Sequence, residues 1–229
     1  EVPGGTVTKA KATCPGCGRV LPPERVRAQL AEQRGGADVV FDKKGTRIGG
    51  ATLLAVVTLK AGEQGRRYRL PAACDYEATF KAQRRLKAIL DEWVQGGRKE
   101  LCPVPDEPLP PIGTLGFRVQ RYGVLQWGDL FTARQKIALG VLAGHVAHRD
   151  ESPVSQELLA LVVDRVASRS SSLCLWRYHA DQEKVEHIFG RQTRSMVWDF
   201  AEAAVTSEST GSFSDGTGVV ADCVESATG

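Results

Sequence analysis

Cys14-Pro15-Gly16-Cys17-Gly18 is the stretch that indicates most about the fold, because it is typical of one half of a zinc-ribbon knuckle. Two thiolates two residues apart can bind one Zn²⁺, and small residues let the backbone turn around the metal. A redox dithiol is the alternative, but it is expected at a strand-to-helix junction, and the run before Cys14 is short and weakly apolar. We therefore predict that Cys14 and Cys17 are zinc ligands.

A complete ribbon needs a second cysteine pair, and the other four cysteines are scattered. They form no disulfide framework, which favours a reducing cytoplasm. We expect zinc in this chain only if Cys74, Cys102 or a histidine folds back to the knuckle. Otherwise the second pair is expected upstream of Glu1, in a longer protein. His145 and His148 are three residues apart and could share a metal, but two histidines near a helix end are the simpler interpretation.

Outward from the knuckle, residues 1–101 are predicted to form a small zinc-knuckle and β-hairpin module with a long basic helix. A helix is expected over 24–34, ended by Gly35-Gly36. Short strands are expected at Val39-Val40-Phe41, over 52–59 and over 66–70. Apolar residues at helical spacing predict a helix over 76–95, with its lysines and arginines on the opposite side.

The charge distribution divides the chain in two. Residues 1–101 hold 19 Lys and Arg against 11 Asp and Glu, whereas residues 102–229 hold 11 against 16. This asymmetry favours a nucleic-acid-binding face in the first part, although a solvated surface or a charge-protected edge strand would also explain it. The residues predicted to contact DNA are Arg19, Arg25, Arg27, Arg66, Arg67, Arg69, Lys81, Arg84 and Arg85.

Residues 102–116 are rich in proline, and we interpret them as an extended connection between two subdomains. Residues 117–229 are predicted to form a mostly helical subdomain, so the fold class is α+β. It begins with a strand pair over 117–127, and Thr132 and Ser152 are predicted to cap two helices. A strand is expected over 170–176, a short helix or turn over 181–189, and a loop over 206–218. Trp198-Asp199-Phe200 is interpreted as core.

Catalytic motifs are absent from these 229 residues. There is no phosphate-binding loop, no Gly-x-Gly-x-x-Gly and no Gly-x-Ser-x-Gly. No apolar run is long enough to cross a bilayer, so no membrane partner is expected.

Four stretches together resemble one family. They are the knuckle with Leu21-Pro22-Pro23, the run from Tyr122-Gly123 through Trp127-Gly128-Asp129-Leu130-Phe131-Thr132-Ala133-Arg134-Gln135, the run Ser172-Leu173-Cys174-Leu175-Trp176, and the run from Phe189-Gly190-Arg191-Gln192 through Met196-Val197-Trp198-Asp199-Phe200-Ala201-Glu202. This resembles the middle of zinc-ribbon-containing, adenine-specific DNA methyltransferases of restriction-modification and phage-defence systems.

The resemblance implies a function, because the chain lacks two motifs that members of this family carry. Members of this family carry an S-adenosylmethionine motif before this region and an Asp-Pro-Pro-Tyr catalytic motif after it. The chain would therefore be the central DNA-recognition and scaffolding insert, with S-adenosylmethionine bound elsewhere in the parent protein and no catalytic residue of its own. Its implied partners are DNA, the rest of the methyltransferase polypeptide and other defence-system subunits. The second half would pack on the catalytic domain.

Two other interpretations remain open from the sequence. One is a non-catalytic zinc-binding module for protein–protein interaction or structure, with an incidental basic face. The other is an independent metal-dependent enzyme that uses His145 and His148.

Overall fold

The computed structural model describes residues 6–8, 10–32, 38–60, 62, 65–99, 101–179, 182–188 and 195–228. Within them the protein is mixed α and β, with five α-helices and small antiparallel sheets, as the α+β prediction requires. None of the helices in this part of the chain is long and apolar enough to cross a membrane.

The helices and short 3₁₀ turns follow one another along the chain as α1 (Pro23–Glu32), α2 (Ala73–Gln95), η1 (Thr114–Gly116), η2 (Val119–Tyr122), η3 (Trp127–Leu130), α3 (Ala133–Ala147), α4 (Pro153–Ala167) and α5 (Phe213–Thr228). The strands are β1 (Val7–Thr8), β2 (Lys11–Thr13), β3 (Val20–Leu21), β4 (Val39–Phe41), β5 (Arg47–Gly50), β6 (Val56–Thr58), β7 (Arg67–Arg69), β8 (Trp176–His179) and β9 (Gln182–Val185). β1, β2 and β3 form a three-stranded antiparallel sheet, and the other strands pair as three hairpins.

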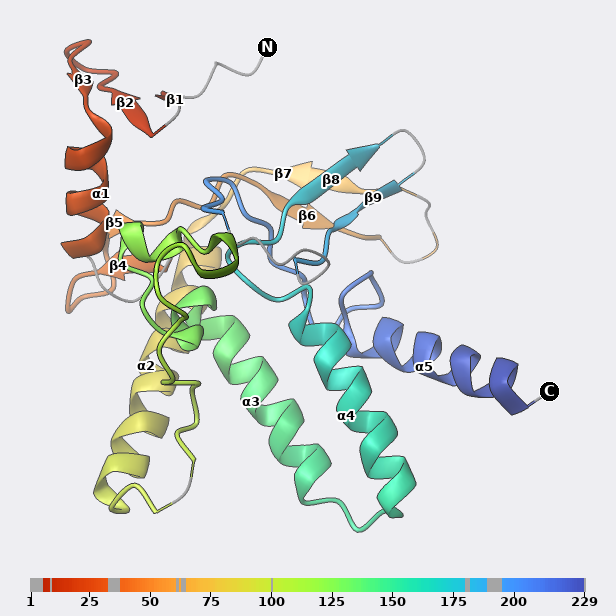
Figure 1. Cartoon of the computed structure of the whole chain (residues 1–229). Helices are drawn as coiled ribbons and strands as arrows, with labels where there is room; N and C mark the ends of the chain where they lie inside the picture. The colour runs from red at the N-terminus through yellow and green to blue at the C-terminus, as the bar shows by residue number, and fades with distance from the viewer. Residues whose placement is uncertain are drawn as a thin grey trace.

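The elements are spread out rather than wrapped around one centre (Figure 1). α2 packs on α3, α3 on α4, and α4 on α5, so the helices form a fan. The three-stranded sheet and α1 lie at one end, and α5 extends at the other (Figure 1). The β6–β7 and β8–β9 hairpins lie side by side above the fan (Figure 1).

A small apolar core joins these parts. Its buried members come from the segments around the 3₁₀ turns and from the turn before β8, and they are Leu109, Phe117, Val119, Val124, Leu130 and Leu173. Trp127, Phe131, Ile188 and Val197 pack against them. Helices alone do not build this core, because most of its residues lie on irregular segments.

α3 begins where three distant segments meet. Thr132 is its N-cap: the Gln135 backbone N–H donates to the Thr132 hydroxyl, and the Gln135 side chain accepts from the Thr132 N–H at 2.9 Å. The Asp38 carboxylate accepts from the Ala133 N–H at 2.9 Å, from 95 residues earlier. The predicted capping box is thus confirmed, and Asp38 adds a cap that ties the β4–β5 hairpin to α3.

α1 docks on η2 through a close backbone approach. Gly123 has a φ of +90°, and a Cβ there would lie 2.7 Å from the Ala31 Cα. The neighbouring Tyr122 ring packs edge-to-face on Trp198, with ring centroids 5.5 Å apart. Glycine at 123 is therefore needed both for the turn and for the approach of the helix.

The molecule exposes much more surface than a compact protein of its size. Its accessible area is 15,224 Å² for a 24.8 kDa chain. A compact monomer of that mass exposes about 10,000 Å². Large apolar side chains are among the exposed residues, including Leu54, Leu70, Leu101 and Val154. This open shape leaves extensive surface uncovered.

Several sequence-based predictions are confirmed. α2 occupies the predicted helix and ends at Gly96 and Gly97. Ser152 caps α4, whose first residue is Pro153, and β4 coincides with an expected strand. The end predicted for the first helix, Gly35-Gly36, lies outside the described residues.

Other predictions are wrong. Residues 117–127 form 3₁₀ turns instead of a strand pair. Residues 170–174 form a buried turn, so the strand begins only at Trp176. Gln182–Val185 is a strand rather than a helix or turn, and α5 starts at Phe213, inside the expected loop. β6 is also shorter than the strand predicted over 52–59. Trp198 is predicted to belong to the core, but its side chain is 45% exposed.

The docking of α1 predicts a difference between two glycines. We expect Gly123→Ala to lower the free energy of unfolding by about 3 kcal/mol, because strain adds to the clash with Ala31. Gly113 has a similar φ of +94°, and no atom lies within 4 Å of the position that a Cβ would take there. Gly113→Ala should therefore cost only about 1 kcal/mol. Urea unfolding of both variants measures the difference, and equal losses would contradict the close approach.

Candidate metal half-site and nucleic-acid interface

The Cys14–Cys17 knuckle is a tight turn between β2 and β3. The Gly18 N–H donates to the Cys14 carbonyl at 2.9 Å, and the Cys14 N–H donates to the Arg19 carbonyl at 2.9 Å. Gly18 has a φ of +68°, which glycine adopts without strain. These bonds place both thiols on one turn at the edge of the three-stranded sheet.

The turn also stabilises a thiolate. Hydrogen bonds from the Cys17 and Gly16 backbone N–H groups, and then from the Cys17 thiol, lower the pKa of Cys14. Thiolates are the form that binds zinc, so the knuckle suits one half of a tetrahedral set.

Nothing among the described residues completes that set. No group of three or more Cys, His, Asp or Glu side chains that could hold a metal occurs in that part of the chain. Cys74 lies in the first turn of α2, and Cys174 is fully buried. His148 ends α3, and its Nδ1 lies 2.8 Å from the Gly144 carbonyl. The structure thus brings neither Cys74, Cys102 nor the histidine pair into a metal site.

Two arginines predicted to contact DNA hold the hairpins in place instead. The Arg66 Nε donates to the Glu183 carbonyl at 2.7 Å, and its guanidinium lies over the Trp176 ring. Arg69 binds Asp75 through two hydrogen bonds of 2.7 and 2.8 Å. Arg67 lies between them on β7 and is exposed.

Asp75 is the centre of the contact between Arg69 on β7 and the start of α2. Besides Arg69, its carboxylate accepts from the Ala72 N–H at 2.7 Å, at the start of α2. Hydrogen bonds from Arg69 and then from the Ala72 N–H hold the pKa of Asp75 far below its usual range. The β6–β7 hairpin is thereby joined to the first turn of α2.

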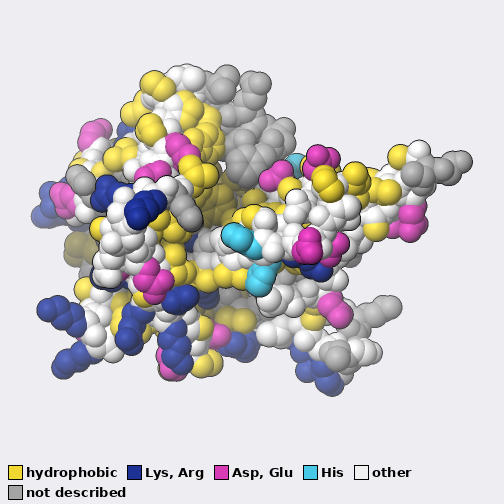
Figure 2. Space-filling view, turned by 90° about the horizontal axis from the view of Figure 1, so that it is seen from below, with side chains coloured by type: hydrophobic (Ala, Val, Ile, Leu, Met, Phe, Trp, Pro, Cys, Tyr) yellow, Lys and Arg dark blue, Asp and Glu magenta, His cyan; other side chains and the backbone are white. Residues whose placement is uncertain are grey.

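The cations of α2 are exposed but balanced by carboxylates. Lys81 pairs with Glu77 at 2.7 Å, Arg85 lies 3.9 Å from Glu92, and Arg84 lies over the Phe80 ring. The helix contains four lysines and arginines and four aspartates and glutamates, so it is not basic overall. Its cations instead gather in the middle turns. Figure 2 shows Lys and Arg side chains gathered on the side of the molecule where α2 lies.

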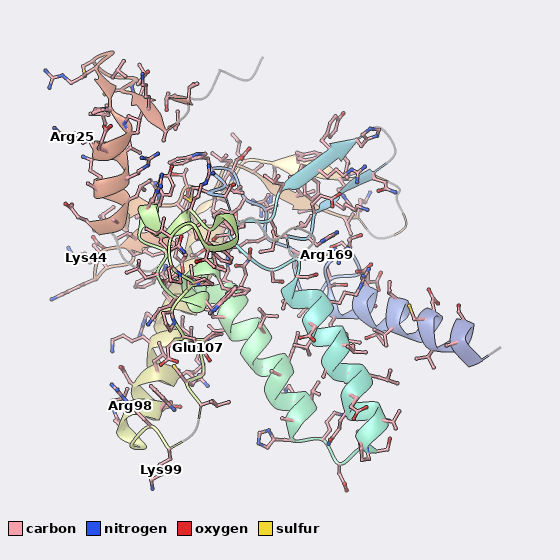
Figure 3. All side chains as sticks on the ribbon, viewed as in Figure 1. Arg25, Lys44, Arg98, Lys99, Glu107 and Arg169 are labelled. Atoms are coloured by element: carbon pink, nitrogen blue, oxygen red, sulfur yellow. The ribbon has the colours of Figure 1, made fainter. Side chains whose placement is uncertain are left out.

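The cations around the knuckle are Arg19, Arg25 and Arg27. Arg19 and Arg25 are exposed, and Arg25 lies on the outer side of α1 (Figure 3). Arg27 is half-buried, with its guanidinium 5.8 Å from the centre of the Tyr122 ring. The exposed pair can reach a phosphate without breaking a contact of the fold.

The structure brings together the runs that carry the family resemblance. The Ser172 N–H donates to the Leu130 carbonyl at 2.7 Å, and the Ala201 N–H donates to the Cys174 carbonyl at 2.8 Å. Arg134 forms a 2.7 Å ion pair with Glu202. Residues 189–192 of the last run lie outside the described residues. These contacts could not be predicted from the sequence, because nothing in the runs shows which groups meet.

Comparison with known proteins found no match for this chain among protein-family models, curated proteins or solved structures.

The Arg69–Asp75 contact predicts a pH dependence. Because the folded pKa of Asp75 is lowered, its contribution to stability is present above about pH 4 and is lost as the pH falls below that value. We expect Asp75→Asn to lower stability at neutral pH and to flatten the loss of unfolding free energy on acidification. Thermal or urea unfolding from neutral to acidic pH measures this.

Asp91→Asn is the matched control, because Asp91 pairs with Lys87 on the exposed face of the same helix. Exposed pairs of this kind contribute little to stability. If the unfolding free energy of Asp75→Asn falls on acidification as steeply as that of the wild-type protein, the role of Asp75 is contradicted.

Two thiolates on one turn predict selective protection by zinc added in excess, although the described residues supply no further ligand. Added zinc should slow alkylation of Cys14 and Cys17 by iodoacetamide and leave the exposed Cys74 and Cys223 unaffected. Mass spectrometry of the alkylated peptides measures each cysteine in the same sample. Equal rates at all four cysteines with and without zinc would contradict the half-site.

Proposed function

We propose that this chain is the central zinc-ribbon and DNA-recognition insert of an S-adenosylmethionine-dependent, adenine-specific DNA methyltransferase. In this proposal the chain binds DNA and supports the catalytic domain, and it performs no chemistry itself. The cofactor and the catalytic residues belong to other parts of the parent protein. Three features support the proposal, namely the open surface, the convergence of the runs and the exposed cations.

The open surface is the observation that carries the proposal. The excess of roughly 5,000 Å² over a compact monomer is several times the area that one partner buries in a standard interface. Exposed leucines and valines lie on this surface, and contact with other parts of a larger protein would cover them. An insert that is covered by the rest of a large enzyme accounts for both features.

The convergence of the runs supports the family assignment. The pairs Leu130–Ser172, Cys174–Ala201 and Arg134–Glu202 join stretches that carry the resemblance on sequence alone. Tyr122 and Trp198 add an aromatic contact between two of the same stretches. If these runs specify a common architecture, they are expected to meet in space.

The DNA-binding part of the proposal rests on cations that are exposed and make at most weak contacts in the fold. Arg66 joins two hairpins and Arg69 joins a hairpin to α2, so they are poor candidates for phosphate contacts. Arg19, Arg25 and the middle turns of α2 remain available. Their carboxylate partners on α2 are exposed, and such pairs are weak enough for phosphates to compete. Methylation of a base also requires it to leave the duplex, so the backbone must be held meanwhile.

A non-catalytic interaction or scaffolding module is the second candidate. The equal number of cations and carboxylates on α2 favours it, because such a helix attracts DNA weakly. The same open surface would then serve only protein contacts.

DNA binding separates the two candidates. The purified chain should bind duplex DNA with an affinity that falls steeply with salt. For Arg84→Glu with Arg85→Glu, we expect the slope of log K against log salt concentration to decrease in magnitude by about 2, one for each lost phosphate contact. Fluorescence anisotropy with a labelled duplex measures both quantities.

Arg149→Glu is the control, because Arg149 is an exposed arginine on the turn between α3 and α4. It should leave the slope unchanged. An unchanged slope in the double variant removes α2 from the DNA interface. No duplex binding at low salt would favour the scaffolding candidate, and methyl transfer by the chain alone would refute the assignment of the active site to other parts of the protein.

A further inference from the structure

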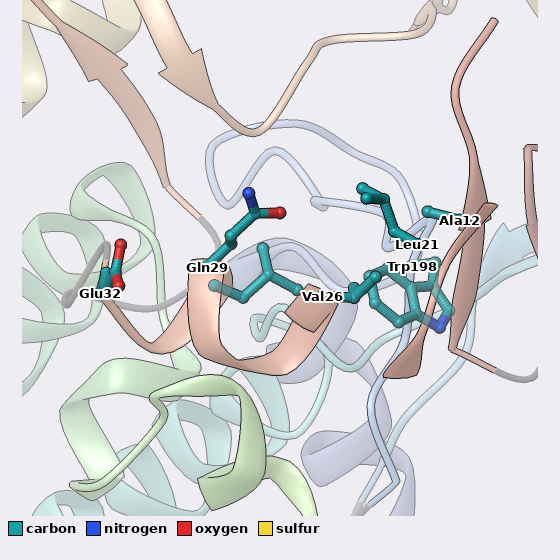
Figure 4. A pocket seen from close by; sticks show the side chains of 7 residues that line it. Ala12, Leu21, Val26, Gln29, Glu32 and Trp198 are labelled. Carbon is teal, nitrogen blue, oxygen red and sulfur yellow. The ribbon is translucent and has the colours of Figure 1, made fainter. Parts of the chain in front are cut away.

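A groove of about 490 Å³ lies between the three-stranded sheet, α1 and the segment around Trp198 (Figure 4). Ala12 and Leu21 line it from the sheet, and Val26, Gln29, Leu30 and Glu32 line it from α1. We propose that this groove binds one unstacked nucleobase of a DNA strand against Trp198. This inference rests on the proposed DNA-recognition function and assigns that function a specific binding site.

Trp198 provides a stacking surface at one end of the groove. The residue is 45% exposed, although tryptophan is highly buried on average. The Tyr122 ring packs edge-to-face on it with centroids 5.5 Å apart, and the Arg27 guanidinium lies 5.8 Å from the centre of the Tyr122 ring. These contacts support the indole, while part of its surface stays open to the groove.

The walls of the groove match a flat, partly apolar ring with polar edges. Leu21 and Val26 lie beside the indole in Figure 4 and would contact the faces of a base. Gln29 lies one turn further along α1, where its amide can both donate to and accept from a base edge. Every base has a face that can stack, so Trp198 supplies affinity for any base. Gln29 supplies the preference for one base over another.

Charge determines how a strand would enter. From Val26 to Glu32 the groove follows α1 for about 9 Å. Glu32 lies at the end away from Trp198, and its carboxylate repels phosphate there (Figure 4). Arg19, Arg25 and Lys11 lie around the same sheet and helix and are exposed. In this proposal the sugar-phosphate backbone passes along these exposed cations outside the groove, and the base enters the groove.

This combination of groups favours a nucleobase over an apolar peptide. A peptide would fill the apolar walls, but it would gain nothing from the cations around the groove. A nucleotide uses both, since its phosphate binds the cations and its base stacks on Trp198.

The test compares two single strands. One probe is a short strand of abasic nucleotides with a single central deoxyadenosine, and the other is the same strand with an abasic nucleotide at that position too. The wild-type chain should bind the first probe about tenfold more tightly and with quenching of tryptophan fluorescence. Trp198→Leu should remove both the affinity difference and most of the quenching. Gln29→Ala leaves the aromatic stack intact and should lower the affinity ratio while quenching persists.

Tyr178→Leu is the control, because Tyr178 is a 77% exposed aromatic residue on β8, outside the groove. It should keep the wild-type affinity ratio. Equal affinity of the wild-type chain for both probes overturns the inference, and so does an unchanged ratio in both groove variants. If duplex DNA still binds in a salt-dependent way, the proposed function survives that result. If neither strand nor duplex binds, both proposals fail. Self-association that Trp198→Leu abolishes, with no effect of the central base, would assign the groove to a second copy of the chain and overturn the inference.

Discussion

The ion pair between Arg134 and Glu202 is the contact on which the second half of the molecule depends. Its atoms lie 2.7 Å apart, and the side chains are only 33% and 20% exposed. Burial raises the pKa of Glu202, whereas Arg134 and a hydrogen bond from Thr132 oppose that shift. The start of α3 favours the carboxylate through the positive end of the helix dipole, although the Asp38 carboxylate bound there raises the pKa of Glu202 further. The start of α3 thus holds together three segments, namely the residue before β4 (Asp38), the helix itself and the run after β9 that contains Glu202.

Elements whose signals are local could be predicted from the sequence, and elements that depend on distant partners could not. α2 and α3 carry helical spacing and caps of their own, so their positions follow from neighbouring residues. The segment before β8 has apolar residues that suggest a strand, but Ser171 accepts from the Leu173 N–H and holds a turn. The sequence of β9 is polar, and only its pairing with β8 makes it a strand.

The same limit applies to the candidate site. The Cys14–Cys17 turn could be predicted, because its spacing and small residues act within a few positions. Arg66 and Arg69 could not be distinguished from Arg19 or Arg25 by sequence. Nothing in the sequence shows whether an arginine side chain binds a carbonyl or faces solvent. Glu183 lies 117 residues after Arg66, and only the fold brings the two together. The groove could not be predicted for the same reason, since Trp198 and α1 are remote in sequence.

The contact between the β6–β7 and β8–β9 hairpins has a consequence for synthesis. Arg66 leaves the ribosome well before Glu183, and 117 residues take roughly 6 to 20 s to translate. During that interval the Tyr68 hydroxyl has no Glu183 carboxylate to bind, and the aromatic contact with Trp176 is unmade. Until then the β6–β7 hairpin, a two-stranded sheet whose strands are both edges, lacks its later neighbour. Its three arginines, Arg66, Arg67 and Arg69, discourage neighbouring nascent chains from pairing with it through like-charge repulsion.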